Sequence, residues 1–238
     1  ERYRALAAIA REHDAAALVV AHQADDQAES VLLHLLRGAG LRGAAAMAEW
    51  SERTMPWWPE ANEPAAPLVI WRPFLTEPRA TLRDYLTRAD LRSIDDPSND
   101  DPRFRRNAIR RDLLPLLERI APGAAAALAR HAALAADEDA MLDDFAACAL
   151  DEARRADGAV RVAPLLGAPV PLRRRALRAW VASAAPDVEL SAERTAAALA
   201  LADSGRGGTI EIGAGWTIAR DGGVLRLDRN GERAGAAG

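Results

Sequence analysis

The 238-residue sequence contains no lysine, and all 31 of its basic residues are arginine. A genomic codon bias towards Arg and Ala is the simplest explanation of this excess. The absence still excludes a Walker A phosphate loop, which needs a lysine. It also excludes Schiff-base chemistry, because a guanidinium stays protonated and offers no free amine. Any amine nucleophile must therefore come from a substrate.

Cysteine, long apolar runs and a signal peptide are scarce or missing. Cys148 is the single cysteine, which excludes an internal disulfide and a Cys-rich metal site. No apolar run approaches the roughly 18 residues of a membrane span, and the start shows no signal-peptide pattern. The formal net charge of −4 argues against indiscriminate nucleic-acid binding. We therefore expect a cytoplasmic protein that makes no membrane contact.

The first half of the chain has the pattern of an α/β domain, with apolar runs that alternate between the helical and the strand period. The predicted elements, in chain order, are a helix at 2–13, a buried strand at 18–20, a helix at 25–36 ended by Gly38 and Gly40, a Pro-rich loop at 49–67, a strand at 68–71, and helices at 78–89 and 103–119. The first strand has no partner earlier in the chain, so we expect the segment to begin within a fold.

After Pro122-Gly123 the composition becomes Ala-rich and helical, and the end alternates as a small β meander. The predicted helices are 124–156, 171–184 and 191–203, and the predicted strands are 209–212, 216–220 and 224–227. We predict three parts: a domain at 1–118, a helical domain with a β meander at 119–230, and a disordered tail at 231–238.

A cluster of carboxylates follows the first predicted strand. Asp25, Asp26 and Glu29 share the first turns of the next helix, and His22 precedes them. Asp26 and Glu29 have the spacing of a capping box, and the helix dipole alone stabilises carboxylates there. The alternative is functional, because clustered carboxylates repel one another and a Mg²⁺ ion or a substrate ammonium relieves that repulsion. The residues by themselves leave both interpretations open.

A polar turn at 95–101 leads into five arginines within the nine residues 103–111. Such a patch suits phosphate groups. Alternatively, the arginines pair with the neighbouring aspartates of the turn and form a solvated helix face. Charge alone favours this second interpretation.

The order of residues in four blocks resembles the bacterial tRNA(Ile)-lysidine synthases, members of the PP-loop superfamily. The matching patterns are A-H-x-x-D-D-Q-x-E-[ST] at 21–30, L-R-G-x-G-L-R-G at 36–43, R-P-[LF]-L at 72–75 with Arg79, and D-P-S-N-x-D-x-x-[FY]-x-R-N-x-[IL]-R at 96–110. The resemblance covers about residues 2–120, with looser similarity through the rest.

The resemblance implies a fold and a reaction. The fold is α/β: a partial PP-loop (adenine nucleotide alpha hydrolase-like) domain, then a mainly helical domain with a small terminal β meander. The partners are ATP with Mg²⁺, free L-lysine and tRNA(Ile) with a CAU anticodon, and a homodimer is possible; no prosthetic group is expected. ATP adenylates C2 of the wobble cytidine with release of pyrophosphate, and the lysine amine then displaces AMP to form lysidine.

The resemblance also assigns roles to particular residues. Catalytic roles fall on Asp25, Asp26, Glu29, Arg37 and Arg42, with Asp26 and Glu29 as ligands of Mg²⁺ or acceptors for the lysine ammonium. Substrate or tRNA contacts fall on His22, Asp96, Asn99, Arg105, Asn107 and Arg110. Trp57 and Trp58 suit stacking on anticodon bases, although anchoring of a loop is the simpler role.

The family's ATP-binding loop, S-G-G-x-D-S, does not occur in the 238 residues. Ser204–Gly208 is no substitute, because the following Asp-Ser is absent. We therefore expect this chain alone to bind ATP poorly and to be inactive. The rival interpretations are a 2-thiocytidine-type PP-loop thiolase, which the single cysteine disfavours, a non-catalytic tRNA-binding module, and a generic helical interaction domain.

Overall fold

The computed structural model describes residues 2–53, 67–92, 103 and 105–229. The chain divides into two compact units, Glu1–Asp139 and Ala140–Gly238. This division falls inside helix α7 (Ala124–Ala153), whereas the sequence predicts a boundary at 118/119, which stays a prediction. Several predictions fall outside the described residues: those for Trp57, Trp58, Asp96, Asn99 and the tail at 231–238.

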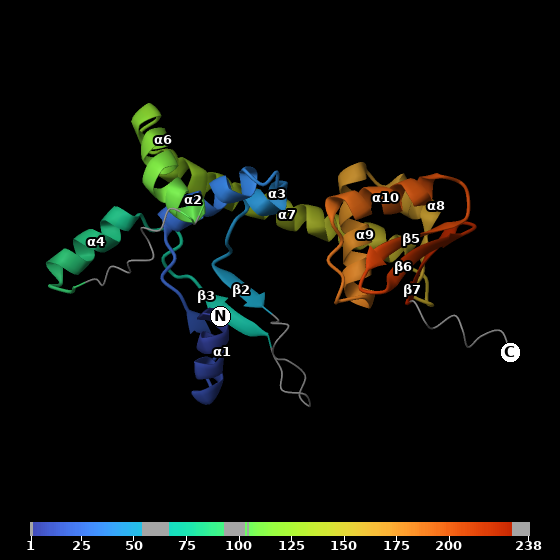
Figure 1. Cartoon of the computed structure of the whole chain (residues 1–238), viewed down its shortest axis with the longest axis horizontal. Helices are drawn as coiled ribbons and strands as arrows, with labels where there is room; N and C mark the ends of the chain where they lie inside the picture. The colour runs from blue at the N-terminus through green and yellow to red at the C-terminus, as the bar shows by residue number, and fades with distance from the viewer. Residues whose placement is uncertain (1, 54–66, 93–102, 104, 230–238) are drawn as a thin grey trace. The chain divides into compact units, whose positions relative to one another are not determined.

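The first unit contains a three-stranded sheet in the order β1-β3-β2. Strand β1 (Leu18–Val19) is parallel to β3 (Leu68–Trp71), and β2 (Trp50–Arg53) is antiparallel to β3. Figure 1 shows β2 and β3 side by side. Trp50 and Trp71 are cross-strand partners, and their rings stack 5.1 Å apart, an arrangement that stabilises paired strands.

Two predictions for this sheet are wrong. The predicted loop at 49–67 begins with strand β2, because aromatic pairing with β3 outweighs the loop-like composition of the whole segment. The predicted burial of the first strand also fails, since Val19 is exposed. In the described sheet β1 is an edge strand, paired with β3 alone. Only one of its faces is covered by α1, through a small apolar cluster that includes Ala7, Ala10 and Ile70.

The helices of the first unit follow the predicted order. They are α1 (Arg2–Glu12), α2 (Ala24–Leu35), the short α3 (Leu41–Ala44), α4 (Arg79–Arg88), α5 (Arg105–Ala108), the π-helical segment η2 (Ile109–Leu113), α6 (Leu114–Ile120) and the first part of α7. The single helix predicted at 103–119 is thus interrupted by η2. Pro115 explains the interruption, because it lacks the N–H that would continue the regular bonding of the preceding turn.

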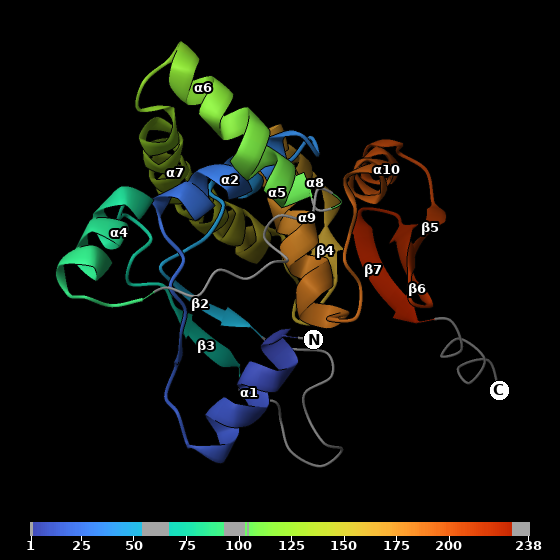
Figure 2. The same cartoon turned by 60° about the vertical axis from the view of Figure 1, so that its left-hand side comes forward.

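The described part of the second unit consists of the last part of α7, three further helices and a four-stranded antiparallel sheet in the order β4-β7-β6-β5. The elements are β4 (Val160–Arg161), α8 (Val162–Gly167), α9 (Val170–Ala184), α10 (Ala192–Asp203), β5 (Gly208–Gly213), β6 (Trp216–Asp221) and β7 (Val224–Arg229). The predicted β meander is confirmed, and β4 and α8 are additions. Figure 2 shows α8, α9 and α10 grouped on one side of the sheet.

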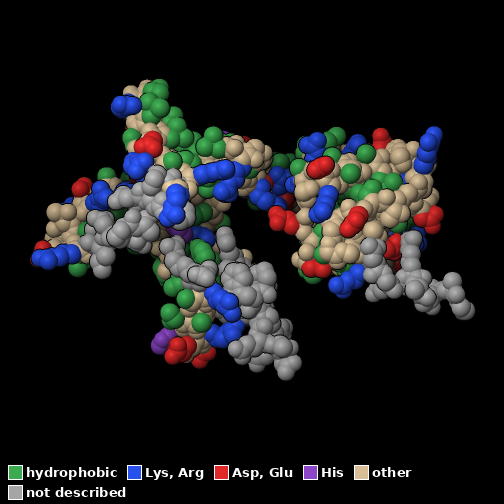
Figure 3. Space-filling model, viewed as in Figure 1, with side chains coloured by type: hydrophobic (Ala, Val, Ile, Leu, Met, Phe, Trp, Pro, Cys, Tyr) green, Lys and Arg blue, Asp and Glu red, His purple; other side chains and the backbone are tan. Residues whose placement is uncertain are grey.

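The core of the second unit lies between these helices and the sheet. Trp180 is the largest fully buried side chain, and it packs with Leu177, Ile212, Ile218 and Leu225. Its indole N–H donates to the carbonyl of Gly158 at 2.9 Å, so its one polar group is satisfied. Arginine and acidic side chains are interspersed over the face of this unit that Figure 3 shows. Within the described ranges, no helix combines the length and the apolar character that crossing a bilayer requires.

Candidate active site

Helix α2 carries the predicted carboxylates, and it is capped differently from the prediction. The helix begins after Gln23, whose backbone N–H donates to the Asp26 carboxylate at 3.1 Å. The capping box therefore pairs Gln23 with Asp26, one turn earlier than the predicted pair of Asp26 and Glu29. Glu29 instead points into the protein and is fully buried.

The two carboxylates of Asp26 and Glu29 are bound by two arginines of the Arg-rich segment. The Nε of Arg110 lies 2.6 Å from Glu29 Oε1, and the Nε of Arg106 lies 2.8 Å from Glu29 Oε2. A terminal nitrogen of each arginine also reaches Asp26 Oδ1, at 3.1 Å from Arg106 and 2.9 Å from Arg110. We name these four residues the α2–η2 ion cluster. It joins two sequence blocks that lie about eighty residues apart.

Helix α4 adds a third arginine to this cluster. The Asp25 carboxylate accepts the backbone N–H of Arg79 at 2.9 Å, and the Arg79 guanidinium lies 3.7 Å from Glu29. The hydrogen bond to Glu29 raises the pKa of Arg110 above its usual value; burial opposes this, and the negative charges of Glu29, Asp26 and Asp25 support it. Arg110 is therefore a permanent cation, and a buried carboxylate such as Glu29 needs such partners.

The structure separates the predicted residues of the Arg-rich segment. Arg110 belongs to the α2–η2 ion cluster, Asn107 is half-buried nearby in α5, and Arg105 is exposed. Arg106 was missed as a candidate, although the sequence held the signal: the arginine of the matching pattern that precedes Asn107 is Arg106, not Arg105. The expectation that these arginines pair with Asp95, Asp96, Asp100 and Asp101 concerns residues outside the described ranges.

Arg37 and Arg42 do not join the ion cluster. Arg42 has a side chain that is 72% exposed and lies 3.3 Å from Asp139 Oδ2 on α7. Arg37 is exposed after the end of α2 and, with Arg105, edges an apolar pocket of about 440 Å³ floored by side chains such as Leu33 and Ile109. Both arginines are thus presented outward, whereas the carboxylates are withdrawn.

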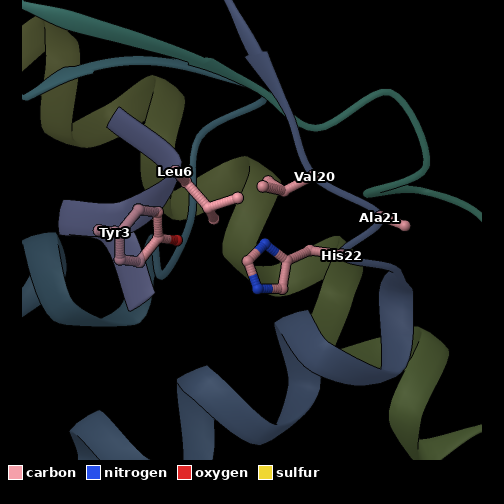
Figure 4. Close-up of a pocket in the computed structure, with 5 residues that line it drawn as sticks. All are labelled: Tyr3, Leu6, Val20, Ala21 and His22. Carbon is pink, nitrogen blue, oxygen red and sulfur yellow. The ribbon is translucent and has the colours of Figure 1, made fainter. Parts of the chain in front are cut away.

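His22 lines a different pocket, of about 270 Å³, at the carboxyl end of β1. Figure 4 shows its imidazole in this pocket with Tyr3 and Leu6 of α1, beside Val20 and Ala21. Ligands of open α/β sheets bind at this edge of the strands. His22 therefore lies where ligands bind in such sheets, whereas the ion pairs of the α2–η2 ion cluster are made by other residues.

The cluster does not fit a metal ion as it stands. All four carboxylate oxygens of Asp26 and Glu29 already accept hydrogen bonds from a guanidinium or from the Gln23 backbone. Mg²⁺ requires near-octahedral oxygen ligands and keeps several waters, which leaves no room beside two bound arginines. Among the described residues, no three His, Cys, Asp or Glu side chains gather as possible metal ligands.

Comparison with known proteins assigns both parts of the chain to protein families. The PP-loop domain family matches residues 1–117, which contain the whole ion cluster, and the TilS substrate binding domain family matches residues 161–226. The chain is therefore a PP-loop protein with a second domain of the TilS type. The expected α/β fold with a helical region and a terminal antiparallel sheet is confirmed.

Three curated relatives narrow the class to one family. Each is named tRNA(Ile)-lysidine synthase. The relative from Chromobacterium violaceum is 41% identical over 164 residues, which cover 69% of this chain and 35% of the relative. The relative from Burkholderia mallei is 47% identical over 156 residues (66% of this chain, 30% of the relative), and that from Thermobifida fusca is 38% identical over 208 residues (87% of this chain, 59% of the relative). The chain belongs to the tRNA(Ile)-lysidine synthase family. It spans about a third of the length of the first two relatives.

Proposed function

We propose that the protein containing this chain is an ATP-dependent ligase that forms lysidine at the wobble cytidine of tRNA(Ile) with a CAU anticodon. The observation that carries the proposal is the α2–η2 ion cluster. It joins two of the blocks that resemble lysidine synthases around one buried carboxylate, through the ion pairs of Glu29 with Arg106 and Arg110. The name shared by the relatives supplies the reaction.

The proposed reaction has two steps. The C2 carbonyl oxygen of cytidine attacks the α-phosphate of ATP and pyrophosphate leaves. The ε-amine of free L-lysine then adds at C2, AMP leaves with the carbonyl oxygen, and the amine loses a proton. These 238 residues contain no lysine, so none of their side chains supplies an amine that competes for the activated cytidine. With ATP and tRNA as its substrates, the protein is proposed to act in the cytoplasm, and a homodimer stays a prediction.

The geometry supports distinct tasks for the two groups of side chains. Arg37 and Arg42 have exposed side chains, so we assign them contacts with phosphate groups of ATP or of the tRNA backbone. The exposed Arg105 extends this basic edge. Asp26 and Glu29 hold the cluster together, and His22 faces the pocket at the strand edge. Mg²⁺ enters the proposal only with the phosphates of ATP, because Asp26 and Glu29 do not fit it in this arrangement.

The test uses protein from the complete reading frame that contains these 238 residues. Labelled L-lysine, ATP and a CAU-anticodon tRNA(Ile) transcript are supplied, and acid-insoluble label and AMP are measured together. We expect stoichiometric incorporation, no incorporation without ATP, and none into a transcript whose wobble cytidine is replaced by uridine. Incorporation of sulfur from cysteine would establish the thiolase instead. Saturable tRNA binding without AMP release would establish a binding module.

A further inference from the structure

The segment between α2 and β2 is held to α2 by a side chain to which no role has been assigned. Gln27 lies between Asp26 and Glu29 and is buried. Its side-chain amide donates to the Met47 carbonyl at 2.7 Å, and its amide oxygen accepts the Met47 N–H at 3.0 Å. Both polar groups of one backbone residue are thus paired with one side chain twenty positions earlier.

A second contact fixes the same segment near its middle. The Nδ1 of His34 lies 2.7 Å from the carbonyl oxygen of Gly43, and because a carbonyl only accepts, the imidazole donates. Gly43 packs so closely that an added Cβ would overlap the Cβ of Ala39 and lie 3.3 Å from that of His34. A side chain at position 43 would therefore overlap Ala39 within the segment and press against His34 of α2.

The backbone within this segment needs such support. Gly38, just past the end of α2, has a φ of 73°, where glycine is favoured. Ala46, immediately before Met47, has a φ of 52°, a left-handed conformation that non-glycine residues adopt only under restraint. The two hydrogen bonds between Gln27 and Met47 supply that restraint.

We propose that Gln27, assisted by His34, is a positioning residue for Arg37 and Arg42. Both arginines lie in the segment that these two side chains seat on α2, and α2 also carries Asp26 and Glu29. Gln27 thereby sets where the outward-facing arginines stand relative to the ion cluster. The inference rests on the proposed function for its catalytic consequence, but the seating itself is independent of any activity.

The test compares two substitutions of Gln27 in protein from the complete reading frame. Gln27→Met keeps the volume and removes both hydrogen bonds, whereas Gln27→Glu keeps an acceptor for the Met47 N–H. Hydrogen exchange at the Met47 amide is measured first. We expect exchange to quicken at least tenfold in Gln27→Met and less in Gln27→Glu. Unchanged exchange in Gln27→Met would overturn the proposal.

Lysine incorporation is then measured on the folded fraction of each variant. We expect kcat to fall at least tenfold in Gln27→Met with partial rescue in Gln27→Glu, while the KM for free lysine changes less than threefold. Faster exchange at Met47 with unchanged kcat would overturn the positioning role. Failure of the unsubstituted protein to incorporate lysine would refute the proposed function, and the exchange result distinguishes the two failures because it needs no turnover.

A pair of glycine substitutions gives a matched control. Gly43→Ala introduces a Cβ that overlaps Ala39 and displaces the segment from α2, so hydrogen exchange at the Met47 amide should quicken at least threefold. Gly40→Ala, three residues away, places its Cβ in open space and should leave that exchange unchanged. Equal changes in Met47 exchange in the two variants would show that the segment is not closely packed at Gly43 and would overturn the inference.

Discussion

Replacing Glu29 by glutamine probes the α2–η2 ion cluster directly. Glu29 is fully buried and binds two arginines, so the substitution removes the charge that both guanidiniums compensate. Breaking a buried ion pair from one side costs about 3–5 kcal/mol. Here the side chains of Arg106 and Arg110 are 37% and 27% exposed and Asp26 still pairs with each, which screens the loss. We therefore expect about 2–3 kcal/mol.

The loss of unfolding free energy is measured by urea denaturation of the chain, with a spectroscopic signal from the first unit as the readout. A loss of this size lowers the melting temperature of a unit of this length by roughly 6–12 °C. Asp112→Asn is the matched control, because Asp112 pairs with the neighbouring Arg111 at 3.2 Å while both side chains are more than half exposed. Its effect should stay within about 0.5 kcal/mol.

A double-substitution cycle identifies the partner. If Glu29 acts through Arg110, the combination of Glu29→Gln with Arg110→Met should cost less than the sum of the two single changes, by at least about 1 kcal/mol. A loss of stability in Glu29→Gln no larger than that in Asp112→Asn would refute the reasoning, because the cluster would then contribute nothing beyond an exposed pair.

Three further outcomes are expected. Arg42→Ala should lower kcat/KM for lysine incorporation at least tenfold yet cost at most about 1 kcal/mol of stability, because the Arg42 side chain is 72% exposed and solvent screens its pair with Asp139 from that side; near-normal turnover in this variant would contradict its assignment. Trp180→Ala should cost about 3–5 kcal/mol by calorimetry of the second unit, which a change below 1 kcal/mol would disprove. Backbone N–H groups at the start of α7 lower the pKa of Glu118. The charged carboxylate therefore stabilises the fold above the ordinary glutamate pKa, and this stabilisation is lost as the pH falls through the lower pKa of the folded state. The difference in melting temperature between wild type and Glu118→Gln should close between about pH 7 and pH 3, and a constant difference would count against this cause.

Local patterns in the sequence were sufficient for most helices and for the β meander. Helix α2 and the strands β5 to β7 were predicted within about two residues, because their apolar periodicity and flanking glycines act over short distances. The family was likewise readable from the ordered blocks at 21–30 and 96–110. The membership that these blocks indicated is confirmed by the relatives.

Strand β2 required the fold, whereas the interruption at η2 has a local cause in Pro115. The residues at 50–53 pair with β3 across a gap in sequence, and no local pattern records which strand will lie beside them. The division of the chain inside α7 is similar, since contacts between distant residues decide it.

The sequence by itself determined which ionic groups this protein has: carboxylates at one helix start, arginines at another, and no lysine. Tertiary structure alone decided which of them meet. Glu29 is buried with Arg106 and Arg110, while Arg37 and Arg42 face outward. The reason is physical: a charge can leave water only where an opposite charge from a distant part of the chain arrives at hydrogen-bond distance, and only folding brings the two together.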